Sequence, residues 1–316
     1  MPRRRGFERA RADDLGVPGR PDAVLRHADL EGQSDVTCAF GGSPVKREVL
    51  PGLGRALIGM VHLLPLPGSP RWAGRMEPVV DRAVADARAI VAGGFHACLV
   101  ENFGDAPFGA GRADPATVAA MGVVVAEVRS SVSVPVGVNV LKHDAQAALA
   151  VAAASGAAFV RLNVHVGAVV GDQGLLQGDA YATLRYRRLL GTETRLFVDV
   201  GGKHAVPLAP VELEQVAHDA VERGLADALV VSGPSTGKPT EPGDVKRVRA
   251  AVPDSPLLVG SGVTPETVSQ LLGLADGVIV GTWLKRDGRT ANQIDPARVT
   301  ALAKAARERK GGGGGA

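Results

Sequence analysis

Eight short apolar runs, separated by segments of helical character, constrain the fold of this 316-residue chain more than any other feature. The runs are rich in Val, Ile and Leu and occupy residues 57–61, 97–100, 136–140, 159–162, 196–200, 228–231, 257–259 and 278–280. Strict alternation of strand and helix predicts parallel strands joined by right-handed crossovers. Eight such units over roughly 250 residues match a (β/α)8 barrel in number and size. We therefore predict a single barrel of the α/β class.

An open, doubly wound sheet is the main alternative to this barrel. Such a sheet usually carries a G-x-G-x-x-G turn after its first strand, whereas the first run here leads into HLLPLPGSP. Helices are expected between the runs, on the basis of apolar spacing and of Pro and Gly at their ends, over residues 78–92, 115–129, 144–155, 210–223, 265–273 and 295–310.

The two ends of the chain are expected to lie outside the barrel, which we place at residues 51–310. Residues 1–50 are rich in Arg, Gly, Asp and Pro and show no sustained period, which predicts a disordered or loosely docked extension. A misassigned start codon would also explain this extension. Residues 311–316 are expected to form a flexible, Gly-rich tail.

The charge and composition exclude several classes of partner. The first 20 residues hold six Arg against three acidic residues, and this surplus equals the net charge of +3, so no basic nucleic-acid surface is expected on the barrel. Aromatic residues make up only 3%, too few for a base-stacking surface. There is no apolar run of 18 residues and no signal-peptide core, so we expect no membrane insertion and a cytoplasmic location.

Polar side chains follow the first five runs. Active sites of such barrels lie at the C-terminal ends of the strands, so these side chains are the candidate catalytic residues. They are His62, Glu101, Asn139, Asn163, Asp199, Lys203 and His204. Two carboxylates on neighbouring strands suit a general base and a general acid, which we assign to Glu101 and Asp199. Asn163 and the nearby Arg161 have an alternative interpretation as structural polar residues inside the barrel.

The other candidates have supporting roles. Lys203 is expected to stabilise an oxyanion, or to form a Schiff base if its pKa is lowered. His204 is expected to relay a proton near neutral pH. His62, Asn139 and Asn163 are expected to orient hydroxyl groups.

The last three runs end in small residues instead. Gly-rich turns at helix starts bind anions through their backbone N–H groups, and barrels commonly bind phosphate after the seventh and eighth strands. The predicted phosphate-binding residues are Ser232, Gly260, Ser261, Gly262, Gly281 and Thr282. In LLVGSGVTPE, Thr264 is expected to cap the next helix and Pro265 to begin it. A tight turn without a ligand is the alternative interpretation of these glycines.

Other cofactor motifs are weak. GPSTGKPT at residues 233–240 fails the G-x-x-x-x-G-K-[ST] spacing of a nucleotide-binding loop. The two Cys lack a paired metal-ligand spacing, and Cys98 lies within an apolar run where a small core residue is expected. We predict neither an organic cofactor nor a dedicated metal site. Mg²⁺ held by Glu101, Asp105 or Asp199 stays open, because carboxylates and phosphate together suit this ion.

Seven stretches carry these features: LIGMVHLLPLPGSP (57–70), LVENFGDAPF (99–108), VGVNVLKHDAQAALA (136–150), FVRLNVHVGAVVGDQGLLQGDAYATLRYRR (159–188), VDVGGKHAVPLA (198–209), ALVVSGPSTGKPT (228–240), and VGSGVTPETV through ADGVIVGTWLKRDG (259–288). In this order they resemble the BtpA/SgcQ family of predicted barrel enzymes. That family looks like the ribulose-phosphate-binding group of barrels. Its name comes from a role in photosystem I biogenesis in cyanobacteria.

The residues and the resemblance together favour an enzyme. We expect an isomerase, lyase or glycosyl-transfer enzyme acting on a small phosphorylated, sugar-like metabolite. A non-catalytic binding or assembly factor that retains an anion site is the alternative, because fold alone does not decide function. Metal-assisted hydrolysis of a nucleotide or glycoside is a third hypothesis. Barrels of this type often pair, so a homo-oligomer is also expected.

Overall fold

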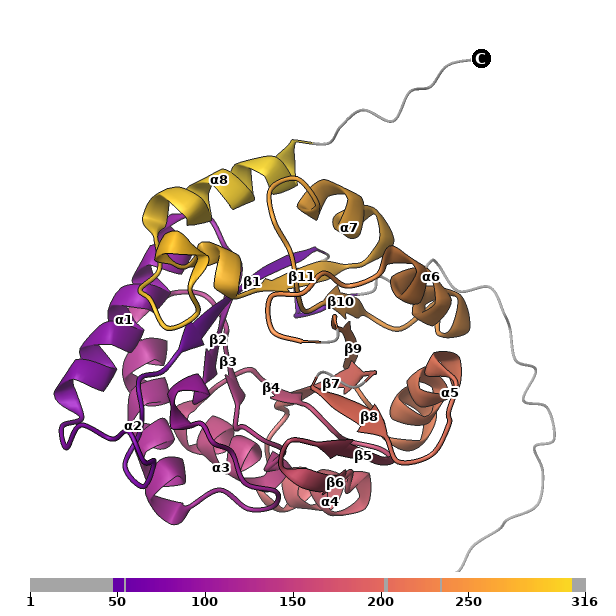
Figure 1. Cartoon of the computed structure of the whole chain (residues 1–316), viewed down its shortest axis with the longest axis horizontal. Helices are drawn as coiled ribbons and strands as arrows, with labels where there is room; N and C mark the ends of the chain where they lie inside the picture. The colour runs from indigo at the N-terminus through magenta and orange to yellow at the C-terminus, as the bar shows by residue number, and fades with distance from the viewer. Residues whose placement is uncertain (1–47, 54, 202–203, 234, 309–316) are drawn as a thin grey trace, which may run out of the picture. The chain divides into compact units, whose positions relative to one another are not determined.

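Eight parallel strands close into one barrel, which confirms the predicted (β/α)8 architecture (Figure 1). The computed structural model describes residues 48–53, 55–201, 204–233 and 235–308. Around the barrel the strands follow the order β1-β11-β10-β9-β7-β4-β3-β2. Their bounds are β1 Ala56–His62, β2 Ala97–Glu101, β3 Val136–Asn139, β4 Phe159–Leu162, β7 Arg195–Val200, β9 Ala228–Val231, β10 Leu257–Val259 and β11 Gly277–Val280. The predicted tail at 311–316 lies outside the described residues, as does nearly all of the predicted extension.

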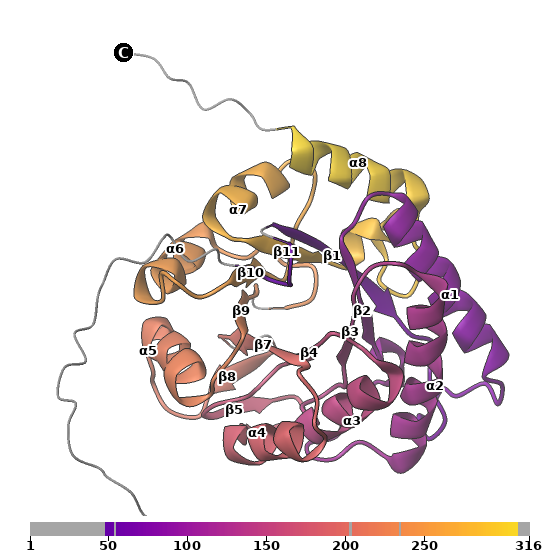
Figure 2. The same cartoon turned by 180° about the vertical axis from the view of Figure 1, so that it is seen from behind.

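Helices surround the barrel on the outside, as Figures 1 and 2 show from opposite ends. In the described part of the chain they are α1 Glu77–Ala92, α2 Pro115–Ser131, α3 Ala145–Ser155, α4 Ala180–Leu189, α5 Leu213–His218, α6 Pro242–Ala251, α7 Val268–Leu274 and α8 Pro296–Arg307. The sequence analysis did not predict α4 and α6. Only Thr183 of α4 and Val245 and Val248 of α6 are buried, so neither helix shows a clear apolar period.

Helix α7 begins later than the sequence predicted. Thr267, rather than Thr264, occupies the position before its first residue, Val268. The carbonyl of Thr264 accepts hydrogen bonds from the N–H groups of Thr267 at 3.1 Å and Val268 at 2.9 Å. The predicted helix start at Pro265 is therefore wrong, because these bonds close a separate turn before the helix.

Alternating strand residues build two apolar layers, one inside the barrel and one beneath the helices. Phe159 and Phe197 stack in the interior with ring centroids 4.5 Å apart. The interior layer also contains Ile58, Met60, Leu99, Val230, Leu258 and Ile279, together with Val49 and Leu50. Cys98 belongs to the outer layer, where burial raises the pKa of its thiol to about 12, as expected for an inert core residue.

A small antiparallel sheet stands beside β4 and β7 and was not predicted. It consists of β5 Ala168–Gly171, β6 Gly174–Gln177 and β8 Ala205–Pro207, in the order β6-β5-β8. Asp172 and Gln173 form the two-residue turn between β5 and β6. The hairpin is inserted after β4, so the simple alternation of strands and helices does not reveal it. No helix in the described ranges is long and apolar enough to span a membrane.

Candidate active site

The last inward-facing position of each barrel strand lies at the C-terminal mouth of the barrel. These positions follow from counting every second residue beyond the interior apolar layer. They are His62, Glu101, Asn139, Arg161, Asp199, Ser232, Gly260 and Gly281. The register pairs His62 with Glu101 and Glu101 with Asn139 on neighbouring strands. The barrel therefore brings most of the predicted catalytic and phosphate-binding residues into one ring.

Arg161 and Asp199 form a buried ion pair in this ring. Arg161 Nε donates to Asp199 Oδ1 at 2.8 Å, and Nη2 donates to Oδ2 at 3.0 Å. Asn163 Nδ2 also donates to Asp199 Oδ2, at 3.0 Å, and Arg161 Nη2 donates to Ser232 Oγ at 3.2 Å. Burial lowers the pKa of Arg161, but the adjacent carboxylates of Asp199 and Glu101 raise it overall. The Asp199 carboxylate is therefore held by three donors, and its predicted role as a general acid stays a prediction. The expectation that Asp199 and Glu101 lie on neighbouring strands is wrong, because β4 and β3 stand between β7 and β2 in the barrel.

Glu101 lies in the same ring and faces the space inside the mouth. Its carboxylate Oε1 lies 3.6 Å from His62 Nε2, and both side chains are buried. Phe103 packs against the His62 ring at a centroid distance of 4.9 Å. The arrangement places a carboxylate and an imidazole side by side, close to the charged guanidinium of Arg161, which is a geometry suited to proton transfer.

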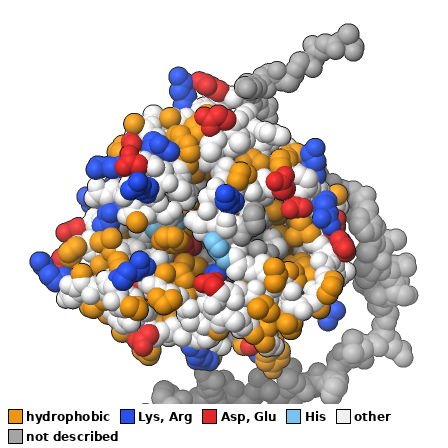
Figure 3. Space-filling model, viewed as in Figure 1, with side chains coloured by type: hydrophobic (Ala, Val, Ile, Leu, Met, Phe, Trp, Pro, Cys, Tyr) orange, Lys and Arg blue, Asp and Glu red, His pale blue; other side chains and the backbone are white. Residues whose placement is uncertain are grey.

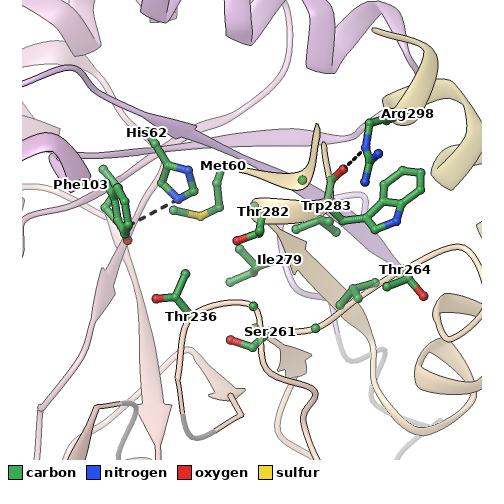
Figure 4. A pocket seen from close by; sticks show the side chains of 18 of the residues that line it. Met60, His62, Phe103, Thr236, Ser261, Thr264, Ile279, Thr282, Trp283 and Arg298 are labelled. Atoms are coloured by element: carbon green, nitrogen blue, oxygen red, sulfur yellow. Dashed lines mark hydrogen bonds and ion pairs between the residues drawn. The ribbon is translucent and has the colours of Figure 1, made fainter. Parts of the chain in front are cut away.

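The predicted phosphate-binding turns line a cavity of about 180 Å³. We call this cavity the cup. Its walls include Gly260–Thr264 after β10 and Gly281–Trp283 after β11, with Thr236 and His62 facing them (Figure 4). The Ser261 side chain is buried, and its Oγ has no hydrogen-bond partner among the described residues. A buried hydroxyl without a partner is costly unless a ligand or water satisfies it.

Backbone donors also remain available at the cup. Within the described residues, the N–H groups of Gly262, Val263, Thr282 and Trp283 donate to no protein acceptor. The N–H of Gly260 differs, because it donates to the carbonyl of Val231 at 2.8 Å. The Gly260 N–H is therefore not available to a phosphate, and the residue contributes to the cup only through its lack of a side chain.

Two glycines at the cup have no room for a side chain. Gly262 has φ +67°, and a Cβ there would lie 2.3 Å from Pro239 Cα. A Cβ on Gly281 would lie 2.9 Å from Cε1 of the His62 ring. These positions therefore need glycine so that the backbone can line the cavity closely.

Arg298 is a cup residue that the sequence analysis missed. It comes from α8, its guanidinium carbon lies 4.4 Å from the centre of the Trp283 ring, and its Nε donates to the carbonyl of Trp283 (Figure 4). The chain between β11 and α8 is anchored nearby, because buried Lys285 donates to Asp86 of α1 at 3.0 Å. The sequence analysis considered only residues at strand ends, and Arg298 lies within α8, so that pattern could not identify it.

A second cavity, of about 340 Å³, adjoins the cup and shares Glu101, Phe103, Arg161 and Thr236 with it. We call it the central cavity. Its other walls include Lys142, Asn163, Asp172 and His204. Lys142 Nζ donates to Asp172 Oδ1 at 3.1 Å, which ties the turn between β5 and β6 to the loop after β3. Desolvation raises the pKa of Asp172, whose side chain is largely exposed, but the hydrogen bond and charge of Lys142 lower it overall.

The remaining predicted residues are placed as follows. The exposed His204 side chain accepts a hydrogen bond at Nε2 from the Thr236 N–H, at 2.9 Å. Asn139 is fully buried, and neither atom of its amide has a partner in the described part of the chain. Ser232 is not among the residues that line the cup, and its hydroxyl accepts a hydrogen bond from Arg161 Nη2. Lys203 lies outside the described residues.

Carboxylates considered for Mg²⁺ are partly engaged elsewhere. Asp105 accepts hydrogen bonds from the Leu66 N–H at 2.7 Å and from Asn102 Nδ2 at 3.0 Å. Asp199 is held by Arg161, so of these three carboxylates Glu101 is the one that lines both the cup and the central cavity. Within the described residues, no three His, Cys, Asp or Glu side chains gather closely enough to hold a metal ion.

Comparison with known proteins places the chain in a family. The model of the BtpA family matches residues 54–308. The chain is 45% identical over 252 residues to the Photosystem I biogenesis protein BtpA of Synechocystis, covering 80% of this chain and 88% of that protein. It is 35% identical over 257 residues to the putative sgc region protein SgcQ of Escherichia coli K12, covering 80% of this chain and 94% of SgcQ.

Solved structures show the same fold at low sequence identity. Thiamine phosphate pyrophosphorylase from Pyrococcus furiosus superposes with a TM-score of 0.51 at 13% identity, over 81% of this chain and 98% of that chain. The family model matches most of the chain, and the cyanobacterial BtpA and SgcQ of Escherichia coli are similar over most of their length. The protein therefore belongs to the BtpA family.

Proposed function

We propose that this protein is an enzyme that acts on a small phosphorylated, sugar-like metabolite by acid–base chemistry. One observation carries this proposal: the cup, whose buried Ser261 hydroxyl has no hydrogen-bond partner among the described residues, shares its lining with the Glu101 carboxylate and the Arg161 guanidinium. The cup suits a phosphate group, and the central cavity suits hydroxyl and carbonyl oxygens.

The phosphate fixes one end of the substrate in this proposal. The backbone N–H groups around Gly262 and Thr282 and the Ser261 hydroxyl donate to the phosphate oxygens. Arg298 adds a positive charge at the edge of the cup, where its guanidinium stacks on Trp283. Binding energy from this remote group would then position the reacting part of the substrate beside Glu101.

The chemistry proceeds at the boundary of the cup and the central cavity. Glu101 removes a proton from carbon or oxygen next to a carbonyl group, and the neighbouring His62 returns a proton to the substrate. Negative charge that builds on the carbonyl oxygen is stabilised by Arg161, which Asp199 and Ser232 hold in place. Isomerisation uses these steps directly, and cleavage of a C–C bond uses the same stabilisation of negative charge on a carbonyl oxygen. Transfer at a glycosidic carbon would instead need His62 to protonate the leaving group and Glu101 to deprotonate the incoming nucleophile.

The proposal is tested by calorimetric titration of the full chain with inorganic phosphate and sugar phosphates, followed by NMR in D₂O. An enzyme of this kind binds phosphate and catalyses turnover or solvent deuterium exchange of one sugar phosphate. Absence of phosphate binding in the titration would contradict the proposal at its first step. Binding without turnover or exchange for any sugar phosphate would support the second candidate.

The second candidate is a non-catalytic assembly factor, and two observations favour it. A relative with 45% identity is named a photosystem I biogenesis protein. In addition, Val170 pairs with Leu175 and with Val206 across the small sheet, and all three side chains are exposed. An exposed apolar row of this kind is typical of a contact surface. Val170→Asp would abolish complex formation but leave phosphate binding intact if this candidate were correct.

A further inference from the structure

A third cavity opens beside the central cavity, between the small sheet and α5. It measures about 320 Å³, and we call it the side pocket. Its walls are mainly apolar and include Val164, Val166, Val169, Leu208 and Val216. Of the site residues predicted from the sequence, Asn163 and Asp199 are the ones found among its described lining residues. An apolar pocket of this size suits a ring-sized group rather than a phosphate or a sugar.

The rim of the side pocket is unusually apolar for a surface. Leu208 and Val211 both line the pocket, yet they are 60% and 43% exposed. Figure 3 shows hydrophobic side chains gathered over the part of this face where β8 and α5 lie. Exposed apolar side chains mark a binding surface, and the hollow that they surround here suits a small ligand.

The inner end of the side pocket is polar. Asn163 and Asp199 line it. Asn163 Nδ2 is committed to Asp199, but Asn163 Oδ1 is buried and has no hydrogen-bond partner within the described residues. An amide oxygen in this state needs a donor, so the occupant should carry one N–H or O–H on its apolar body.

The three cavities follow one another across the mouth of the barrel. Asn163 lines both the side pocket and the central cavity, while Glu101 and Arg161 line both the central cavity and the cup. A ligand that fills all three would present a phosphate, then a polar middle, then an apolar group. The reacting part of the substrate would lie in the middle, beside Glu101.

From this order of cavities we infer that the substrate is a sugar phosphate bearing an apolar ring with a hydrogen-bond donor, such as an arylamine or nitrogen heterocycle. The side pocket holds the ring, and Asn163 Oδ1 accepts its donor. The inference rests on the proposed function, because it needs the phosphate in the cup. It narrows the reaction to one at or near the carbon that joins the sugar to the ring.

Three probes of increasing size test the inference on the full chain by calorimetry: inorganic phosphate, ribose 5-phosphate and phenyl riboside 5-phosphate. The phenyl compound should bind about tenfold or more tightly than ribose 5-phosphate, because its ring leaves water for an apolar wall. Ala209→Trp fills the side pocket from an exposed position and should abolish this advantage. Ala154→Trp, which places the same indole at an exposed position of α3, should retain it.

The outcomes separate the two proposals. If phosphate and ribose 5-phosphate do not bind, the proposed function fails and the inference falls with it. If they bind but the phenyl ring adds no affinity, or if Ala209→Trp leaves its advantage intact, the inference is wrong while the phosphate cup stands. Equal weakening of ribose 5-phosphate and the phenyl compound by Ala209→Trp would also overturn the inference, because the sugar does not reach the side pocket.

Discussion

Arg161 of β4 and Asp199 of β7 join two neighbouring strands through a bidentate ion pair at the floor of the barrel mouth. Both side chains are almost fully buried, at 3% and 2% exposure. The pair fixes the direction of the Arg161 guanidinium toward Ser232 and the cavities. Asp199, predicted as the general acid of a carboxylate pair with Glu101, thus also supports a buried cation.

Breaking this pair should destabilise the fold. Asp199→Asn and Arg161→Met should each lower the free energy of unfolding by about 3–5 kcal/mol, because each leaves a buried group uncompensated. Urea denaturation measures the change. The double variant Arg161→Met/Asp199→Leu should lose less than the sum of Arg161→Met and Asp199→Leu. Additive losses would show that the two side chains act independently.

Glu101→Gln tests the proposed proton transfer. The variant should keep the fold and its phosphate affinity, since the proposal assigns the phosphate to backbone N–H groups and to Ser261, but should lose about 10²–10⁴-fold in kcat on the identified substrate. Steady-state kinetics of wild type and variant give the comparison. Glu127→Gln, on the exposed face of α2, is the matched control and should retain full activity. Full activity of Glu101→Gln would remove Glu101 from the mechanism.

Ser261→Ala should weaken phosphate binding without lowering stability. Inorganic phosphate should bind about tenfold or more weakly, because a hydrogen bond to a charged group is lost. The free energy of unfolding without ligand should stay the same or rise, because the buried Oγ has no partner in the described structure. Calorimetry and urea denaturation measure the two quantities. Ser130→Ala, whose hydroxyl lies on the exposed end of α2, should leave phosphate binding unchanged.

His165 should make stability depend on pH. Burial lowers the pKa of His165 below its ordinary value of 6.5, and its Nε2 donates to the Gly224 carbonyl at 2.7 Å. The unfolded chain therefore binds a proton before the folded chain does, and the free energy of unfolding should fall as the pH drops below 6.5. Urea denaturation at pH 7.5 and pH 5.5 should show a smaller difference for His165→Gln than for wild type. The exposed His218→Gln is the control, and an unchanged pH dependence in His165→Gln would contradict this account.

The strand ends could be read from the sequence because they depend on short, local patterns. The apolar runs located the eight barrel strands, and the step of two residues from Phe159 to Arg161 also marks Arg161 as inward-facing. The same step finds Glu101 and His62 without any structure. Helices α4 and α6 were not predicted because each buries only one or two residues, which is too few to give an apolar period in the sequence.

What the sequence by itself determined is the barrel and the polar composition of its mouth, because alternation along a strand and the order of strand and helix are local properties. Only the tertiary structure decided which charged groups meet. Closing the barrel brings Arg161 to Asp199 across 38 positions of sequence and Lys285 to Asp86 across 199. It also places Glu101 at the boundary of the cup and the central cavity, and it creates the side pocket from β8, α5 and the loop after β4. These pairings depend on strand neighbours and helix packing, which no short stretch of sequence encodes.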